Sequence, residues 1–157
     1  MSRTRHRATV TTTLLASLFL APAAFGAGAP APPGYDCSPT GNTIFGTAGN
    51  DILFGTAGND LIFGGPGNDR IDGRGGNDTI YGGRGRDIIR GGPGRDCVLG
   101  QDESDRVDGG DGKDWVDSGA GDDFLTGGPG DDYVDGGTGF DSVTSRQGND
   151  IYLRVEH

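Results

Sequence analysis

The sequence predicts an all-β protein built from stacked nine-residue repeats. Twelve consecutive units of nine residues run without insertion or deletion from Gly46 to Leu153. The sixth position of every unit is Asp, and the eighth is aliphatic in eleven units and Tyr152 in the last. Gly supplies 33 of the 157 residues, a composition that would indicate disorder if it were not periodic. The periodicity therefore favours an ordered repeat fold.

The first 26 residues are typical of a secretory signal peptide. Three arginines precede a short apolar run, Leu14–Leu20, and small residues then allow cleavage after Ala23 or Gly26. A membrane anchor, which is the alternative, needs about 20 apolar residues. The run here is shorter and meets Pro22. We therefore expect a secreted, extracellular protein without stable insertion into a membrane.

The charge of the chain excludes a nucleic-acid partner. The formal net charge is -10, and removal of residues 1–26 leaves ten basic against 23 acidic residues, a formal charge of -13. Binding to phosphates needs a basic surface. We expect no nucleic acid among the partners.

Two short segments lie between the signal peptide and the regular repeats. Residues 27–36 are rich in Pro, Gly and Ala, and we expect a flexible lead-in. Residues 37–45 form a degenerate first repeat, with Asn42 and Ile44 at the positions that later carry Asp and an aliphatic residue. The ordered domain is therefore expected to begin at residue 37.

The C-terminal end of the repeat region is short. The twelve repeats cover residues 46–153, and only residues 154–157 follow them. We expect Tyr152, Leu153 and Val155 to help close this end of the fold.

Each unit combines a turn with a strand. Gly at positions 1, 2 and 4 tolerates positive φ, so the chain can turn tightly and direct carbonyl oxygens inward. The last three residues of a unit alternate outward, inward and outward, as a short strand must. Carbonyl and carboxylate oxygens are hard ligands that suit Ca²⁺. The predicted metal ligands are the Asp residues at position 6, namely Asp51, Asp60, Asp69, Asp78, Asp87, Asp96, Asp105, Asp114, Asp123, Asp132, Asp141 and Asp150.

Units such as GGPGNDRID (Gly64–Asp72) and GGPGDDYVD (Gly127–Asp135) resemble the glycine- and aspartate-rich nonapeptides of the RTX family of hemolysin-type calcium-binding repeat proteins. The resemblance implies a right-handed parallel β-roll with two repeats per coil and Ca²⁺ between turns stacked on the same edge. It also implies that the position 6 carboxylates and the carbonyls near positions 2 and 4 are the ligands. Residues 37–157 would then form a calcium-binding β-roll.

Calcium is expected to be part of the fold. One aliphatic side chain in nine residues is a thin core, and its burial does not offset the conformational entropy of the ordered chain. Stacked Asp residues also repel one another until a cation lies between them, so we predict that folding and calcium binding are one event. Two rows of six turns leave five gaps each, which limits the number of ions to about ten. The unit Gly100–Asp108 lacks Gly at positions 2 and 4, and we expect a distorted turn and a weak site there.

The outward residues of alternate units predict two unlike sheets. One sheet carries an alternating charge ladder, Asp72–Arg90–Asp108, which is typical of a solvated face. The other is apolar and aromatic, which indicates a partner such as a second copy of the chain, a cell surface or a polysaccharide. Alternatively, its aromatic side chains stack on one another, or residues 27–36 fold over them. The residues of the possible partner face are Phe45, Phe63, Tyr81, Leu99, Trp115 and Tyr133.

The two cysteines do not fit a regular roll as a pair. Cys37 and Cys97 lie three coils apart on one side, or roughly 14 Å at about 4.8 Å per coil. A disulfide needs Cα atoms within about 7 Å. Three alternatives follow: the first unit folds back, both thiols are free, or the cysteines join two chains.

The repeats favour binding over catalysis. The only histidines are His6 and His157, at the two ends of the chain, which argues against a hydrolase triad. Adjacent carboxylates such as Asp122 and Asp123 add charge to a calcium turn. We therefore predict a secreted calcium-binding protein, not an enzyme, in which Ca²⁺ drives folding of the roll. The alternative is a calcium-stabilised interaction module that uses the apolar face for self-association or for a cell-surface or polysaccharide partner.

Overall fold

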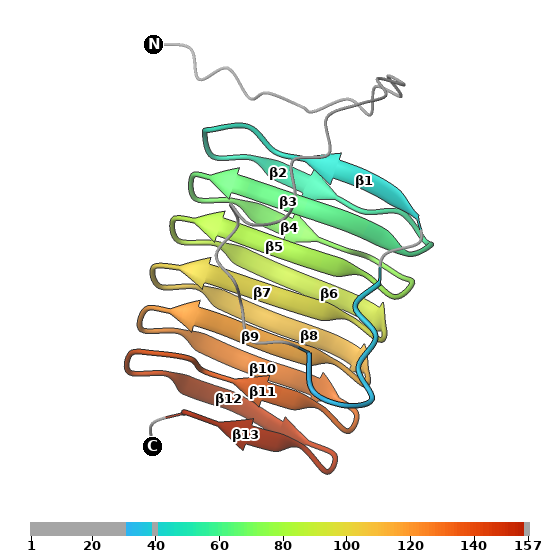
Figure 1. The fold of residues 1–157 in the computed structure, drawn as a ribbon, viewed down its shortest axis with the longest axis vertical. Coiled ribbons are helices and arrows are strands. Elements are labelled where there is room, and N and C mark those ends of the chain that lie inside the picture. The colour runs from blue at the N-terminus through green and yellow to red at the C-terminus, as the bar shows by residue number, and fades with distance from the viewer. Residues whose placement is uncertain (1–30, 39–40, 156–157) are drawn as a thin grey trace.

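The computed structural model describes residues 31–38 and 41–155. This part of the chain forms 13 β-strands in two sheets and contains no helix. Accordingly, none of its segments is a helix of the length and hydrophobicity that a membrane span requires. The expected signal peptide, residues 1–26, lies outside the described residues. Figure 1 shows the strands stacked coil upon coil from β1 to β13.

The strands alternate between two parallel sheets. Sheet A has the order β1-β3-β5-β7-β9-β11-β13, and sheet B has the order β2-β4-β6-β8-β10-β12. In sheet A the bounds are β1 (Asn42–Phe45), β3 (Asp60–Pro66), β5 (Thr79–Arg84), β7 (Cys97–Asp102), β9 (Trp115–Ala120), β11 (Tyr133–Asp135) and β13 (Ile151–Leu153). In sheet B they are β2 (Ile52–Phe54), β4 (Arg70–Asp72), β6 (Ile88–Gly94), β8 (Arg106–Gly112), β10 (Phe124–Pro129) and β12 (Ser142–Gln147).

The register between strands confirms two repeats per coil. Ile62 pairs with Ile80 in sheet A, and Leu53 pairs with Ile71 in sheet B, so each residue lies beside the one 18 positions further along the chain. Since 18 residues are two nine-residue units, each coil contributes one short strand to each sheet. The predicted all-β fold, a parallel β-solenoid of nine-residue repeats, is therefore confirmed.

The position 8 side chains fill the space between the sheets. Tyr152 and Val155 pack against the C-terminal end of this core, as expected, whereas Leu153 is 40% exposed on sheet A. Leu153 is outward because it follows Tyr152 in a strand, where successive side chains point to opposite faces. The buried core residues are Leu53, Ile62, Ile71, Ile80, Ile89, Val98, Val107, Val116, Leu125 and Val134.

Glycine at position 4 allows the coils to approach closely. Gly112 has a φ of 142°, and a Cβ atom built on it would lie 1.6 Å from the carbonyl oxygen of Gly94, one coil earlier. No side chain can occupy this space while the coils keep their spacing. At Gly112 the absence of a side chain is therefore a packing requirement as well as a conformational one.

The irregular unit Gly100–Asp108 keeps the register of its neighbours. Gln101 and Glu103 replace Gly at positions 2 and 4 and adopt positive φ values of 89° and 75°. Gln101 still pairs with Gly119 in the next coil of sheet A. The expected distortion is limited to the backbone of Glu103, whose φ lies below the 111–155° of the positive-φ glycines at position 4, and it does not change the register. Two residues accept a left-handed conformation that costs about 1–2 kcal/mol each, and the register of the stacked strands is preserved.

Residues 31–38 cross the outer face of sheet A as a strap (Figure 1). The strap is held by a disulfide between Cys37 and Cys97, whose Cα atoms are 5.6 Å apart. The Thr79 hydroxyl donates to the carbonyl oxygen of Cys37 at 3.1 Å, and the Arg95 guanidinium donates to that of Gly34 at 2.8 Å. Residues 31–36, expected as part of a flexible lead-in, thus pack against the roll.

The strap resolves the position of the cysteines. Only the last part of the degenerate first repeat, Asn42–Phe45, forms a strand of the roll, whereas Cys37 belongs to the strap. The separation of roughly 14 Å inferred for a regular stack does not hold, because Cys37 is not stacked. Among the three alternatives, the structure contains the folded-back segment and an intrachain disulfide.

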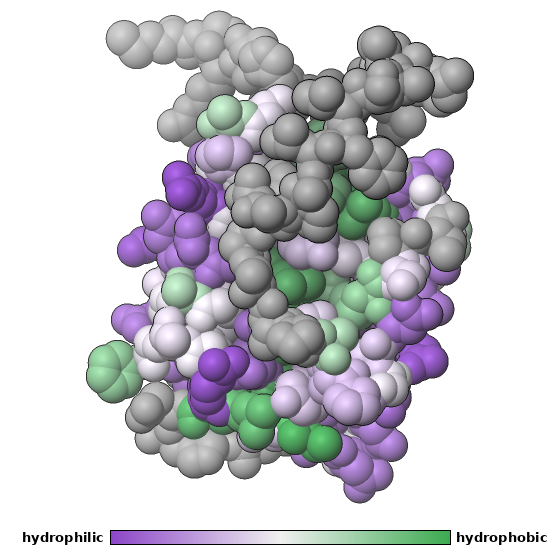
Figure 2. Space-filling view, in the orientation of Figure 1, coloured by the Kyte–Doolittle hydropathy of each residue, from purple (hydrophilic) through white to green (hydrophobic). Residues whose placement is uncertain are grey.

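A small second core lies beneath the strap. Cys97, Leu99 and Trp115 are buried there, with exposed fractions of 2%, 5% and 4%. Ala31 and Tyr35 of the strap pack against them. Figure 2 shows hydrophobic side chains along the middle of this side of the molecule, with hydrophilic residues towards both edges.

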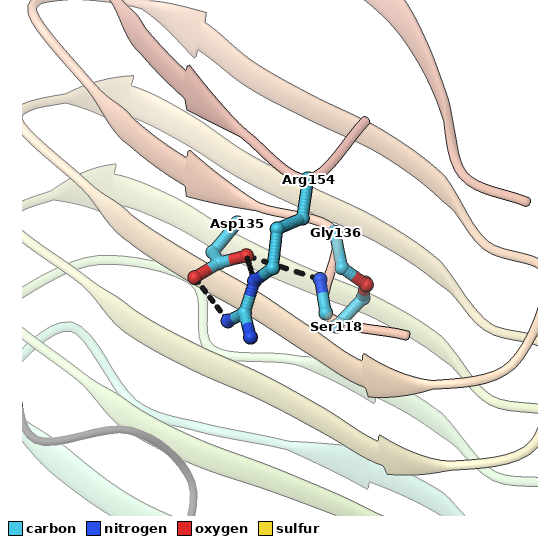
Figure 3. A network of polar contacts seen from close by, with 5 residues as sticks. Ser118, Asp135, Gly136 and Arg154 are labelled. Carbon is cyan, nitrogen blue, oxygen red and sulfur yellow. Dashed lines mark hydrogen bonds and ion pairs between the residues drawn. The ribbon is translucent and has the colours of Figure 1, made fainter. Parts of the chain in front are cut away.

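An ion pair lies near the C-terminal end of the roll (Figure 3). Arg154 donates from Nε to Asp135 Oδ1 at 2.6 Å, and its Nη2 contacts Asp135 Oδ2. Asp135 is 5% exposed, and the guanidinium of Arg154 compensates the charge of this buried carboxylate. The hydroxyl of Ser118 donates to the carbonyl oxygen of Gly136 at 2.7 Å, which joins two coils at the same place.

Candidate metal sites

The position 6 carboxylates form two rows, one along each edge of the roll. The Asp residues of row A lie at the start of the strands of sheet A, and those of row B lie directly before the strands of sheet B. Ten of the twelve side chains are buried, with exposed fractions of 0–2%, while Asp51 and Asp150 are half-buried. Row A comprises Asp60, Asp78, Asp96, Asp114, Asp132 and Asp150, and row B comprises Asp51, Asp69, Asp87, Asp105, Asp123 and Asp141.

In ten of the twelve carboxylates, Oδ1 accepts a backbone N–H from the preceding coil. The backbone N–H of Asp96 donates to Oδ1 of Asp114 at 2.8 Å, and that of Asp87 donates to Oδ1 of Asp105 at 2.8 Å. Ten such bonds of 2.7–3.0 Å join the Asp residues within the two rows, five in each. Oδ1 therefore holds the turns in register.

The other oxygen has no internal partner in most turns. Oδ2 is buried and accepts no hydrogen bond in nine of the twelve Asp residues. A buried charged oxygen without a partner costs about 1–3 kcal/mol or more, so nine of them demand an explanation. They are Asp69, Asp78, Asp87, Asp96, Asp105, Asp114, Asp123, Asp132 and Asp141.

Three Asp residues at the ends of the rows differ. Oδ2 of Asp51 accepts hydrogen bonds from the backbone N–H and hydroxyl of Thr47, and Oδ2 of Asp60 accepts the same pair from Thr56. At the other end, the Tyr152 hydroxyl donates to Oδ2 of Asp150 at 2.6 Å. All twelve predicted ligands thus lie in the two rows, but only nine have an unpartnered oxygen.

The buried carboxylates are electrostatically unfavourable on their own. Burial raises the pKa of Asp105 and Asp114 to about 8, and that of Asp78 and Asp87 to about 7. Desolvation is the main cause; the backbone N–H bond to each carboxylate opposes it, and carboxylates one coil away raise the pKa values further. A cation beside these groups would stabilise their ionised form.

Carbonyl oxygens complete the donor set. A Cβ atom built on Gly83 or on Gly85 would lie 2.1 Å from the carbonyl oxygen of Gly65 or of Gly67, respectively. The carbonyls of positions 2 and 4 thus face the next turn of the same row. In the part of the chain that the structure describes, no three side chains of His, Cys, Asp or Glu form a group that could hold a metal. A bound ion would therefore take ligands from the backbone as well as from Asp, an all-oxygen set that suits Ca²⁺ rather than Zn²⁺.

Position 5 supplies a second hydrogen-bonded ladder. The backbone N–H groups of Asn68 and Asn77 donate to the amide oxygens of Asn50 and Asn59, one coil earlier, at 2.9 and 2.8 Å. The carboxylate of Asp131 accepts from the backbone N–H of Asn149 in the same way. The sequence carried the signal, since Asn recurs at this position, but its role as a turn-to-turn acceptor was not inferred from the sequence.

The possible partner face is divided by the strap. Leu99 and Trp115 lie beneath residues 31–38, so this part of the expected face is covered by the chain itself. The ring of Tyr133 lies 6.0 Å from that of Tyr35 in the strap. On the N-terminal side, the rings of Phe45, Phe63 and Tyr81 stack with centroids 5.2 and 5.1 Å apart and planes inclined by 8°.

Comparison with protein families identifies a repeat family that matches most of the chain. The model of the RTX calcium-binding nonapeptide repeat matches residues 39–71, 63–98, 91–125, 99–134 and 126–153. Together these matches extend from residue 39 to residue 153, which is well over half of the chain. No curated protein matches the sequence.

Proposed function

Because the chain belongs to the family of RTX calcium-binding nonapeptide repeat proteins, we propose that calcium bound between its stacked turns drives the folding of the roll. The protein is a calcium-binding repeat protein with a β-solenoid fold. The proposed ligands are the position 6 carboxylates together with carbonyl oxygens of positions 2 and 4. When bound, Ca²⁺ would supply positive charge and oxygen coordination between neighbouring turns.

The single observation that supports this proposal is the set of nine buried Oδ2 atoms without a hydrogen-bond partner. Each is destabilising unless a cation or a donor satisfies it. The unfolded chain has no such stacked sites, so a cation that binds them stabilises the folded chain selectively. Five gaps between the six Asp residues of each row set an upper limit of about ten ions.

We further propose that the protein acts outside the cytoplasm. Residues 1–26 would be removed as a signal peptide, and residues 37–157 would constitute the calcium-binding domain. The Cys37–Cys97 disulfide supports an oxidising environment, where such bonds persist. Extracellular calcium modules bind with dissociation constants of about 10⁻⁴ to 10⁻³ M, so cytosolic calcium would leave the chain unfolded. No catalytic step is assigned to these residues.

Circular dichroism of the purified protein during a calcium titration, followed by addition of a chelator, tests coupled folding. We expect β-structure to appear with Ca²⁺, to disappear with the chelator, and not to appear with Mg²⁺, which requires a more rigid octahedral site. Asp114→Asn should raise the calcium concentration at the midpoint, whereas the exposed Asp111→Asn should not. β-Structure that precedes calcium and survives chelation would overturn the proposal.

A second candidate function, an interaction module, rests on the apolar side chains that remain outside the strap. Phe45 is 65% exposed at the edge strand of sheet A and stacks on Phe63. We propose self-association through this end of the aromatic column. Phe45→Ser should lower the molecular mass measured by light scattering with calcium present, and Phe140→Ser, at a residue that is 75% exposed on a turn, is the control. A monomer before and after both substitutions would contradict it.

A further inference from the structure

The two N-terminal turns hold their carboxylates differently from the turns that follow. Both turns read GTAGND, with Thr at position 2 in place of the usual Gly. Thr47 donates to Asp51 Oδ2 from its backbone N–H at 2.5 Å and from its hydroxyl at 2.9 Å. Thr56 donates to Asp60 Oδ2 in the same way, at 2.6 and 2.9 Å. Each carboxylate oxygen is thus held by two donors from its own turn.

The backbone of these turns is also different. In the next turn, Gly65 and Gly67 at positions 2 and 4 have φ values of 100° and 133°. Thr47 and Gly49, at the same positions, are not among the residues with positive φ, and neither are Thr56 and Gly58. In this conformation the Thr hydroxyl also accepts the backbone N–H of the Gly at position 4, at 3.2 Å in both turns. The threonine turns therefore direct hydrogen-bond donors to the carboxylate.

The C-terminal end of row A has a related arrangement. The Tyr152 hydroxyl donates to Asp150 Oδ2 at 2.6 Å. Of the twelve position 6 residues, these three end residues have hydroxyl donors on Oδ2, and the remaining nine have no partner there. The two groups do not overlap, and the hydroxyls occur at three of the four row ends; at the fourth, Asp141, Oδ2 has no partner.

We propose that the turns of Asp51, Asp60 and Asp150 are calcium-independent ends of the roll, in which hydroxyl and N–H groups occupy the place that Ca²⁺ takes in the nine other turns. This inference rests on the proposed function. A shared site needs oxygen ligands from two stacked turns, and a terminal turn faces only one such neighbour. A donor from the same repeat compensates the carboxylate without that neighbour. The calcium sites are then confined to the nine turns from Asp69 to Asp141.

A gain of sites is the sharpest test. The double variant Thr47→Gly/Thr56→Gly converts both turns to the regular GGxGND pattern and removes the hydroxyls. We expect native mass spectrometry of the calcium-saturated protein to detect one or two more bound ions than in the unmodified chain. The control Ala48→Gly/Ala57→Gly adds the same number of glycines to the same turns and keeps both threonines. It should leave the ion count unchanged, and an equal count in both double variants would overturn the proposal.

A loss of sites gives an independent readout within one row. Asp78→Asn, one coil from Asp60, should remove one or two ions because its Oδ2 is unpartnered. Asp60→Asn should remove none because Thr56 already satisfies that oxygen. Equal losses in the two variants would overturn the inference while leaving calcium binding intact. If the unmodified chain takes up no calcium, the proposed function itself fails, and the inference fails with it.

Discussion

The interior of the roll repeats, whereas the contacts on the outer face of sheet A occur once. Inside, the coils place apolar residues at one repeat position and Asp at another, and the Asp residues are hydrogen-bonded to their equivalents 18 residues away. Outside, Ala31 and Tyr35 of the strap pack against a cluster that contains Trp115, the single tryptophan of the chain. In a repeat protein, each unit is stabilised mainly by contacts with its nearest neighbours. The strap contacts several coils at once, so it adds contacts that do not depend on the stacking of adjacent units.

The largest effect should come from breaking the spacing of the interior. Gly112→Ala places a Cβ atom 1.6 Å from the Gly94 carbonyl oxygen and requires positive φ, so it should lower the free energy of unfolding by at least about 4 kcal/mol. Gly75→Ala is the matched control, because its Cβ would lie 3.8 Å from the nearest atom. Denaturant unfolding in saturating calcium measures both. Similar losses for the two variants would show that coil spacing is not the cause.

The interior was predictable because its signal is repeated. Asp at position 6 recurs in all twelve units, so the role inferred for it in one unit can be checked against the other eleven. The parity of the units also assigned residues such as Tyr81 and Arg90 to their correct sheets. The alternating charge ladder is present, since Asp72 pairs with Arg90 and Arg90 with Asp108. Local alternation and a fixed period are sufficient to define such a structure.

The strap was not predictable because its signal occurs once. Cys37 and Cys97 are 60 residues apart, and regular stacking placed them too far from each other. The sequence allowed residues 27–36 to cover the aromatic face, but composition alone could not distinguish a packed segment from a flexible one. Tyr35, which packs beneath Lys113, gave no pattern to follow. Contacts between a unique segment and a repeat depend on the three-dimensional surface of the repeat.

The roles within the turns were predictable only in part. Position 6 was identified as a ligand position, but the division between Oδ1, which accepts an N–H, and Oδ2, which does not, depends on the stacked backbone. Thr47 and Thr56 were visible as departures from Gly. Their hydrogen bonds to the carboxylates follow from a backbone conformation that the sequence pattern does not specify.

A second prediction concerns the cost in unfolding free energy of a substitution in each region. We expect this cost to depend on the Cys37–Cys97 disulfide beneath the strap but not in the interior. Trp115 is 4% exposed beneath the strap, and Ile80 is 0% exposed in the interior. Trp115→Ala should cost about 3 kcal/mol in the oxidised protein but about 1–2 kcal/mol less in the Cys37→Ser/Cys97→Ser background, because the strap then no longer holds it buried. Ile80→Ala should cost about 3 kcal/mol in both backgrounds.

Denaturant unfolding of the six proteins in saturating calcium gives the coupling energies. A coupling for Ile80 equal to that for Trp115 would mean that the strap supports the whole roll rather than its outer face. No coupling for either residue would mean that the apolar side chains under the strap are held without it. Either result would remove the distinction between the two regions.

The smallest expected effect on the free energy of unfolding concerns the unit Gly100–Asp108, in which two positions that are usually Gly carry other residues. Glu103 occupies a Gly position with a φ of 75°, and its side chain is exposed. Glu103→Gly should raise the free energy of unfolding by about 0.5–1 kcal/mol, because relief of the left-handed strain exceeds the added entropy of the unfolded chain. Ser104→Gly should lower it by up to about 1 kcal/mol, because Ser104 has no positive φ and its hydroxyl accepts the backbone N–H of Asp122 at 3.3 Å.

Thermal unfolding of both variants in saturating calcium measures the difference. Opposite signs at two adjacent residues would show that the unit tolerates strain to keep its register, and a loss of stability in Glu103→Gly would contradict this explanation.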